Sequence, residues 1–227
     1  METLQTIYKT LSSIFCEPTT AITDFMLSAF CLWCYKAVLS YNRKREYRSH
    51  WALFFLFVAC STFFGGCAHS VSCLQNTLYY KIAWLLMQLS SGISLYFAQK
   101  AVFSTEVKNP KTKSILNTLA LIQIISFCVC VIVFMDFIVV ATNSLIGLLQ
   151  LLIICFPKTR TKLAYKSLVS LGFLTSFLTI YVNRTQLSYA YWFNYNDISH
   201  LIIFTSLLLL YKAIKHKPNL ENFLKTF

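Results

Sequence analysis

Long apolar runs separated by short polar stretches make up most of the chain. A helix that crosses a bilayer needs about 20 predominantly apolar residues. Seven runs approach or reach that length: Ala21–Leu39, Trp51–Val71, Tyr79–Gln99, Ser114–Phe134, Phe137–Phe156, Leu168–Val182 and Trp192–Tyr211. The pattern predicts seven transmembrane helices.

The composition favours a membrane protein. Of the 227 residues, 57% are hydrophobic and only 12% are charged, and the mean hydropathy is +0.60. Soluble domains carry roughly 25% charged residues, so a water-soluble enzyme is excluded. A disordered chain is excluded too, because disorder requires low hydrophobicity and high charge. Seven spans leave little length for a further domain, and the sequence predicts an all-α, polytopic membrane protein.

The net charge of +12 comes from basic clusters between the apolar runs. All Lys and Arg residues except Lys9, Lys81 and Arg184 fall on one side of the predicted bilayer. Such a bias in short loops marks the cytoplasmic side. We therefore expect the amino terminus outside and the carboxyl terminus in the cytoplasm. A nucleic-acid partner is not expected, because the charges do not form one basic face of a soluble module.

The first 20 residues are too polar to span, but their apolar residues recur at helical spacing. Residues 1–20 are predicted to form an outer interfacial amphipathic helix that Pro18 ends, with Thr20 capping the first span. Residues 21–212 then form the seven-helix domain, and residues 213–227 form a cytoplasmic tail.

Most of the nine cysteines lie within predicted spans, where a thiol behaves as a small hydrophobe: Cys31, Cys34, Cys60, Cys128, Cys130 and Cys155. Cys31 and Cys34, although only three residues apart, lack further metal ligands nearby. Cys16, Cys67 and Cys73 lie toward the outer face. Two of them can pair in an oxidising compartment, but the sequence alone does not say which two.

Ionisable side chains inside spans carry most of the functional information, because burying them in hydrocarbon is costly unless they have partners. His69 is placed near the outer end of the second span and His200 one to two turns below the outer surface in the last. Asp24, Asp136 and Asp197 fall at a similar depth. The sequence predicts a polar site in the outer leaflet.

The spacing around the histidines suits metal binding. Asn196 and Asp197 lie four and three residues before His200, on the same helix face. Gly65 and Gly66 precede His69 in the same way and leave that face of the second helix open to a neighbour or a ligand. Two imidazoles and a carboxylate suit Zn²⁺, and an open fourth position with water would make the metal catalytic.

We therefore predict a zinc site formed by His69, His200, Asp197 and Asn196. Asp24 and Asp197 are the candidate catalytic acids or bases.

Each of these residues also has a simpler interpretation. Asp24 suits the first turn of a helix because of the helix dipole, and Asp136 suits a turn exposed to solvent. Asn194, Asn196 and Asp197 can act only as caps of the last helix. A single intramembrane histidine can simply form hydrogen bonds between helices.

The topology and three motifs resemble a known group of membrane proteins. The motifs are Glu17–Asp24, Gly65–His69 and Asn194–His200. Together with seven spans and an outward amino terminus, they are similar to the CREST superfamily, which includes alkaline ceramidases, adiponectin-type receptors and Per1-like proteins. A bacterial branch is expected, and with it a bacterial inner (cytoplasmic) membrane.

The resemblance implies an intramembrane zinc held by three histidines and hydrolysis of a lipid amide or ester. His69 and His200 match two of those histidines. Gly65 stands where the family has a serine, and Asn196 stands where it has the third histidine. Where ceramidases have an acid on the third span, this chain offers only Gln88, Ser90, Ser91 and Ser94.

Two functions follow from these observations. The first is a metal-dependent intramembrane hydrolase of a lipid amide or ester, with Asp197 replacing the missing ligand. The alternative is a non-catalytic, lipid-binding or receptor-like protein of the same fold. A transporter is disfavoured, because the duplicated halves and interrupted helices common in that class are missing. In either case the expected partner is a membrane lipid.

Overall fold

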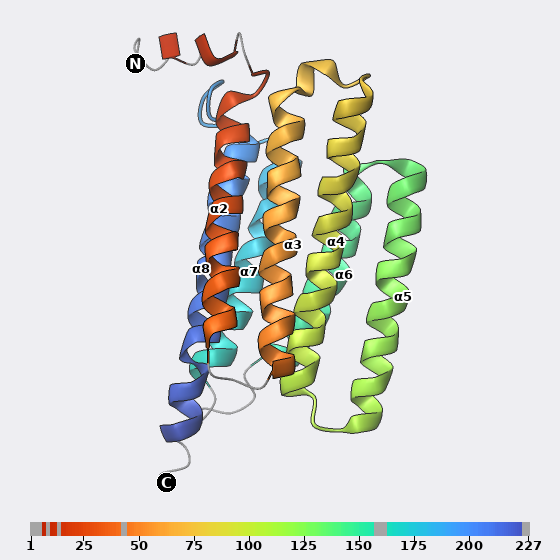
Figure 1. Ribbon diagram of the computed structural model, residues 1–227, viewed down its shortest axis with the longest axis vertical. Coiled ribbons are helices and arrows are strands. Elements are labelled where there is room, and N and C mark those ends of the chain that lie inside the picture. The colour runs from red at the N-terminus through yellow and green to blue at the C-terminus, as the bar shows by residue number, and fades with distance from the viewer. Residues whose placement is uncertain (1–5, 8–9, 13–14, 42–44, 157–162, 224–227) are drawn as a thin grey trace.

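The computed structural model describes the chain except for residues 1–5, 8–9, 13–14, 42–44, 157–162 and 224–227. The described part is all-helical. Its long helices are α2 Pro18–Ser40, α3 Arg45–Ser70, α4 Leu78–Glu106, α5 Pro110–Phe134, α6 Phe137–Cys155, α7 Leu163–Thr185 and α8 Tyr195–Phe223, with the short 3-10 helix η1 at Ser72–Leu74. The long helices run up and down beside one another (Figure 1).

Six helices are long and apolar enough to cross a membrane: α2, α3, α5, α6, α7 and α8. This confirms the prediction of an all-α, membrane-embedded protein. The polar residues of α4, the third predicted span, keep that helix out of the set. Gln88, Ser90, Ser94 and Gln99 on α4 are buried. Since α4 packs against α3, α5 and α6, these side chains face protein.

The start of the first span differs from the prediction. α2 begins at Pro18, with Glu17 at the N-cap position and no side-chain capping bond. Proline suits the first helical position because its missing N–H would be unpaired there anyway. Pro18 therefore starts a helix, and Thr20 is a buried residue inside α2 instead of its cap. Of the predicted interfacial segment, residues 6–7 and 10–12 are helical, and much of the rest lies outside the described residues.

At the other end of the chain, α8 continues to Phe223. Ala213 and Ile214 are fully buried. The last helix therefore extends into the segment predicted as a tail from residue 213.

The main hydrophobic core lies between α2, α3, α4, α7 and α8. Trp51 and Phe55 of α3, Phe103 of α4, Phe173 of α7 and Leu210 of α8 are all at most 2% exposed. The helix α5 lies at the edge of the bundle (Figure 1) and buries only Ala120, Phe127 and Val131. Its remaining apolar surface suits contact with lipid tails.

Buried amides join α5 and α6 to α4. Gln99 Nε2 donates to Gln123 Oε1 at 3.0 Å and to Gln150 Oε1 at 2.8 Å. Gln123 Nε2 donates in turn to Asn143 Oδ1 at 2.9 Å. Polar groups in the interior of a membrane protein need such partners because lipid tails offer none.

Close packing of α4 against α5 depends on Gly92. A Cβ atom added there would collide with the ring of Phe127, and Phe127 is only 3% exposed. We expect Gly92→Ala to lower the free energy of unfolding by about 1–3 kcal/mol, the usual cost of overpacking. The measurement is thermal unfolding in detergent.

Gly92→Ala combined with Phe127→Leu should recover part of the loss, because the smaller side chain makes room. Ser91→Ala, on the same helix, is the control. An unchanged unfolding midpoint in Gly92→Ala would contradict this packing.

Candidate functional site

Ionisable side chains from three helices meet at one end of the bundle. This end carries residues 15–17 and the turn between α3 and α4 (Figure 1). Asp24 of α2, His69 of α3 and His200 of α8 lie here, together with Glu17 and Thr23. We call these five residues the polar cluster. α2 packs against both α3 and α8, so the three helices bring together residues that are far apart in the sequence.

His200 lies between a hydroxyl and a carboxylate. Its Nδ1 is 2.7 Å from Thr23 Oγ1, and its Nε2 is 3.3 Å from Asp24 Oδ1. The side chains of His200 and Asp24 are 12% and 6% exposed. Both ring nitrogens therefore have partners in a largely buried site.

His69 pairs with a carboxylate that was not among the predicted site residues. Its Nδ1 is 2.9 Å from Glu17 Oε2. Burial alone raises the pKa of Glu17, but hydrogen bonding to His69, the charge of His69 and hydrogen bonds to Ser72 and Asn196 together lower it below its ordinary value. The rings of His69 and His200 lie 6.4 Å apart between centroids, edge to face.

Gly65 allows the Asp24 carboxylate to lie against α3. A Cβ atom at this position would be 2.8 Å from Asp24 Oδ2. The neighbouring Gly66 instead faces the ring of Phe25, also at 2.8 Å. The open helix face expected before His69 is thus filled by α2, with the carboxylate at one glycine and an aromatic ring at the other.

Asp197 and Asn194 cap α8 reciprocally. The Asn194 side chain accepts from the backbone N–H of Asn196 at 2.8 Å and of Asp197 at 3.4 Å, and Asp197 Oδ2 accepts from the Asn194 N–H at 2.8 Å. This is a capping box. The other oxygen of Asp197 accepts from the Thr23 hydroxyl at 3.4 Å. The structure thus shows the capping role that the sequence left open.

Asp136 is not part of the polar cluster. It caps α6, where its side chain accepts from the backbone N–H of Ile138 at 2.9 Å, and it is exposed. The turn between α5 and α6 lies on the opposite side of the bundle from α2 (Figure 1). Gln88 of α4 lies near this turn, since its Nε2 donates to the Met135 carbonyl at 3.5 Å. Neither residue has a described contact with His69 or His200.

The donor set predicted for zinc does not fit the observed contacts. In the described part of the chain, no group of three or more His, Cys, Asp or Glu side chains is arranged to hold a metal ion. Both nitrogens of His200 are paired, and both oxygens of Asp197 accept hydrogen bonds within the protein. Asn196 lies in the first turn of α8, where its backbone N–H donates to the Asn194 side chain at 2.8 Å. Zinc at this site stays a prediction.

Sequence reasoning missed Glu17 and Thr23. For Thr23 a signal was present, because Thr20, Thr23 and Asp24 recur at helical spacing and form a polar stripe on α2. Thr20 accepts from Asn194 Nδ2 at 3.4 Å, so this stripe faces α8. For Glu17 the only signal was its place in the motif before Asp24, since it lies outside the apolar run.

Comparison with known proteins gives a family. No curated protein and no solved structure matches the chain. A family model described as a family of unknown function (DUF6962) matches residues 19–219. The match includes Asp24, His69 and His200 and covers nearly all of the helical bundle. The chain therefore belongs to the DUF6962 family.

Proposed function

We propose that the protein is a membrane-embedded hydrolase of a lipid amide or ester, with His200 as its general base and Asp24 as the carboxylate that orients it. One observation carries the proposal: the His200 ring lies between the hydroxyl of Thr23 and the buried carboxylate of Asp24. A base held by a carboxylate on one nitrogen and facing an oxygen with the other is the arrangement used in acyl transfer. The resemblance to the CREST superfamily supports the same class of substrate.

The chemistry follows from this arrangement. A water molecule beside Thr23 attacks the substrate carbonyl. As it attacks, its proton passes to the Thr23 oxygen, and the Thr23 hydroxyl gives its own proton to His200 Nδ1, which lies 2.7 Å away. The new C–O bond forms as the C–N or C–O bond to the leaving group breaks. His200 returns the proton to the departing amine or alcohol, while Asp24 holds the opposite ring nitrogen throughout. Water, amide and base thus yield a carboxylic acid and an amine, and the base is regenerated.

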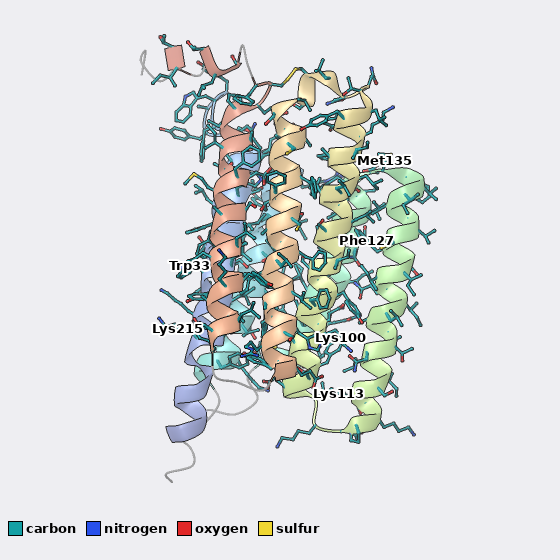
Figure 2. The ribbon with its side chains drawn as sticks, in the orientation of Figure 1. Trp33, Lys100, Lys113, Phe127, Met135 and Lys215 are labelled. Carbon is teal, nitrogen blue, oxygen red and sulfur yellow. A yellow bond between two sulfur atoms is a disulfide. The ribbon has the colours of Figure 1, made fainter. Side chains whose placement is uncertain are left out.

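The proposal places the polar cluster in the outer leaflet of a seven-span protein. α4 has 29 residues and lies alongside the six other long helices (Figure 1). Lys100, Lys113 and Lys215 lie toward the opposite end of the bundle from residues 15–17 (Figure 2), as the positive-inside rule requires for a cytoplasmic end.

A disulfide supports the same orientation. Cys16 and Cys73 are bonded at the end that carries the polar cluster, whereas Cys67 is free. Disulfides persist in oxidising compartments such as the bacterial periplasm. We infer that this end faces outward from a bacterial inner membrane, so the lipid substrate comes from the outer leaflet.

A second candidate is a non-catalytic, lipid-binding role. It is favoured by the contacts of the cluster itself, since Asp197 caps α8 and Glu17 pairs with His69. In that case the histidines tie helices together or bind a lipid headgroup, and no bond is broken.

Removing either partner of the His200–Asp24 pair should abolish hydrolysis. General acid–base groups contribute about 10²–10⁴ to rate, so we expect His200→Gln and Asp24→Asn each to lower kcat at least about 100-fold. The assay uses purified protein in mixed micelles with a panel of fluorescent N-acyl and O-acyl lipids.

Two matched variants serve as controls for this experiment. His50→Gln changes a histidine that stacks on Phe97 away from the cluster, and Asp136→Asn changes the exposed cap of α6. Both should keep activity within about twofold. Full activity in His200→Gln would overturn the hydrolase proposal. Wild-type protein that hydrolyses none of these lipids, yet is stabilised by one of them, would favour the lipid-binding role.

Crowding the Asp24 carboxylate should also reduce catalysis. In Gly65→Ala, the new methyl group would lie 2.8 Å from Asp24 Oδ2, so the carboxylate must shift away. Misplaced catalytic groups can cost up to about 100-fold, and we expect kcat to fall at least tenfold. Gly66→Ala is the matched control, because it meets Phe25 at the same distance. Equal losses in the two variants would show that general packing is responsible.

Metal dependence has its own test, independent of substrate. If zinc is bound, elemental analysis of protein purified without chelator should show about one zinc per chain. His69→Ala and His200→Ala should each lose it, because three protein ligands are the minimum in zinc enzymes. Active wild-type protein without zinc would remove the metal from the proposal and leave the His200–Asp24 pair.

A further inference from the structure

The segment just before α2 is fastened to the end of α3. Cys16 is joined to Cys73 by a disulfide that bridges 57 residues of sequence. Next to it, the Cys16 N–H donates to the Ser70 carbonyl at 3.1 Å and the Glu17 N–H donates to the His69 carbonyl at 3.2 Å. Figure 2 shows the disulfide as a yellow bond at this end of the bundle. We call these three links the clasp.

The clasp fixes where the Glu17 carboxylate lies. Glu17 directly follows Cys16, and its own backbone is bonded to the residue whose side chain it contacts. Its side chain makes no capping bond to α2, so the carboxylate is available to His69, with Oε2 at 2.9 Å from Nδ1. The disulfide and the two backbone hydrogen bonds thus hold the Glu17 backbone next to His69, so that the two side chains meet.

The Glu17 carboxylate determines which nitrogen of His69 carries the proton. An ionised carboxylate only accepts hydrogen bonds, so Nδ1 carries the proton. In a neutral ring, Nε2 is then the nitrogen with a free lone pair. A carboxylate on the far nitrogen is also how proteins orient working histidines.

We propose that Glu17 is a positioning residue for His69, and that the Cys16–Cys73 disulfide holds it in place, so that the site is complete only in the oxidised chain. The expected effect on catalysis rests on the proposed function. The contact between Glu17 and His69 exists whether or not lipid is hydrolysed. The chemical partner is a dithiol reductant. It transfers two electrons and two protons to the Cys16–Cys73 bond, giving two thiols, and is itself oxidised to a disulfide.

The test reads His69 directly. Full-length protein carrying ¹⁵N-labelled histidine is purified in detergent, and the ring nitrogen resonances are assigned with His69→Gln and His200→Gln. The spectra are recorded at a pH at which the His69 ring is neutral, because a charged ring has both nitrogens protonated and no tautomers. In the oxidised wild type, the His69 Nδ1 signal should then be that of a protonated, hydrogen-bonded nitrogen. Reduction with dithiothreitol, and separately the double change Cys16→Ser and Cys73→Ser, should shift the His69 signals toward a mixture of tautomers.

The variants of Glu17 separate positioning from general stability. Glu17→Ala should reproduce the His69 shift with the disulfide intact. Glu17→Gln keeps an accepting oxygen and should restore much of the wild-type signal. Cys67→Ser, which changes a free cysteine, should leave the spectrum unchanged. If the double cysteine variant does not fold, the reduced wild-type protein provides the same comparison.

Activity gives a second, separate readout. The His69 ring lies edge to face against the ring of His200, the proposed base, so a change in its orientation should disturb that base. We expect kcat to fall about tenfold on reduction and in Glu17→Ala, with KM changed less than twofold and with rescue by Glu17→Gln. A His69 spectrum that stays the same after reduction would overturn the role of the disulfide. A spectrum that stays the same in Glu17→Ala would overturn the role of Glu17. If the spectrum shifts as expected but no lipid is hydrolysed by any form, the clasp stands and the hydrolase proposal fails.

Discussion

Placing a carboxylate inside an apolar helical bundle is the constraint on which this end of the molecule depends. Asp24 is 4% exposed, and an ionisable group inside a membrane protein needs a partner, because its burial is costly without one. Its partner, His200, comes from the last helix, so α2 and α8 must meet at this depth. The carboxylate also needs space, which Gly65 provides on α3. One buried acid of α2 is therefore in contact with both α8 and α3.

The rest of the bundle solves the same problem with uncharged groups. A chain of amide hydrogen bonds that starts at Gln99 connects α4 to α5 and α6, and small residues such as Gly92 allow close approach. These contacts require polar residues on α4, and for this reason α4 is less hydrophobic than the helices α5 and α6 beside it. Mean hydropathy therefore does not identify α4 as a transmembrane helix, although α4 carries Gln99, from which these amide contacts start.

The helices were predictable from the sequence, because a long apolar run allows few structures in a membrane. Each of the seven runs overlaps a long helix. The meeting of Asp24, His69 and His200 followed from their common depth. The role of Asp197 did not follow, since three-residue spacing before His200 suits a ligand and a capping box equally well. Only the residue at which α8 begins distinguishes a metal ligand from a capping residue at Asp197. That starting residue depends on the contacts of Asn194 with its neighbours.

Two positions set this chain apart from the CREST proteins that it resembles. At position 65, where the resemblance leads us to expect a serine, the Asp24 carboxylate lies against α3, and any Cβ atom there would be 2.8 Å from Asp24 Oδ2. At position 196, where it leads us to expect a histidine, the chain has Asn196 in the first turn of α8. The two histidines that are present each pair with a carboxylate, His69 with Glu17 and His200 with Asp24. We conclude that the polar cluster is organised as two carboxylate–histidine pairs. In our proposal the His200–Asp24 pair carries out the chemistry, and Glu17 orients His69 beside it.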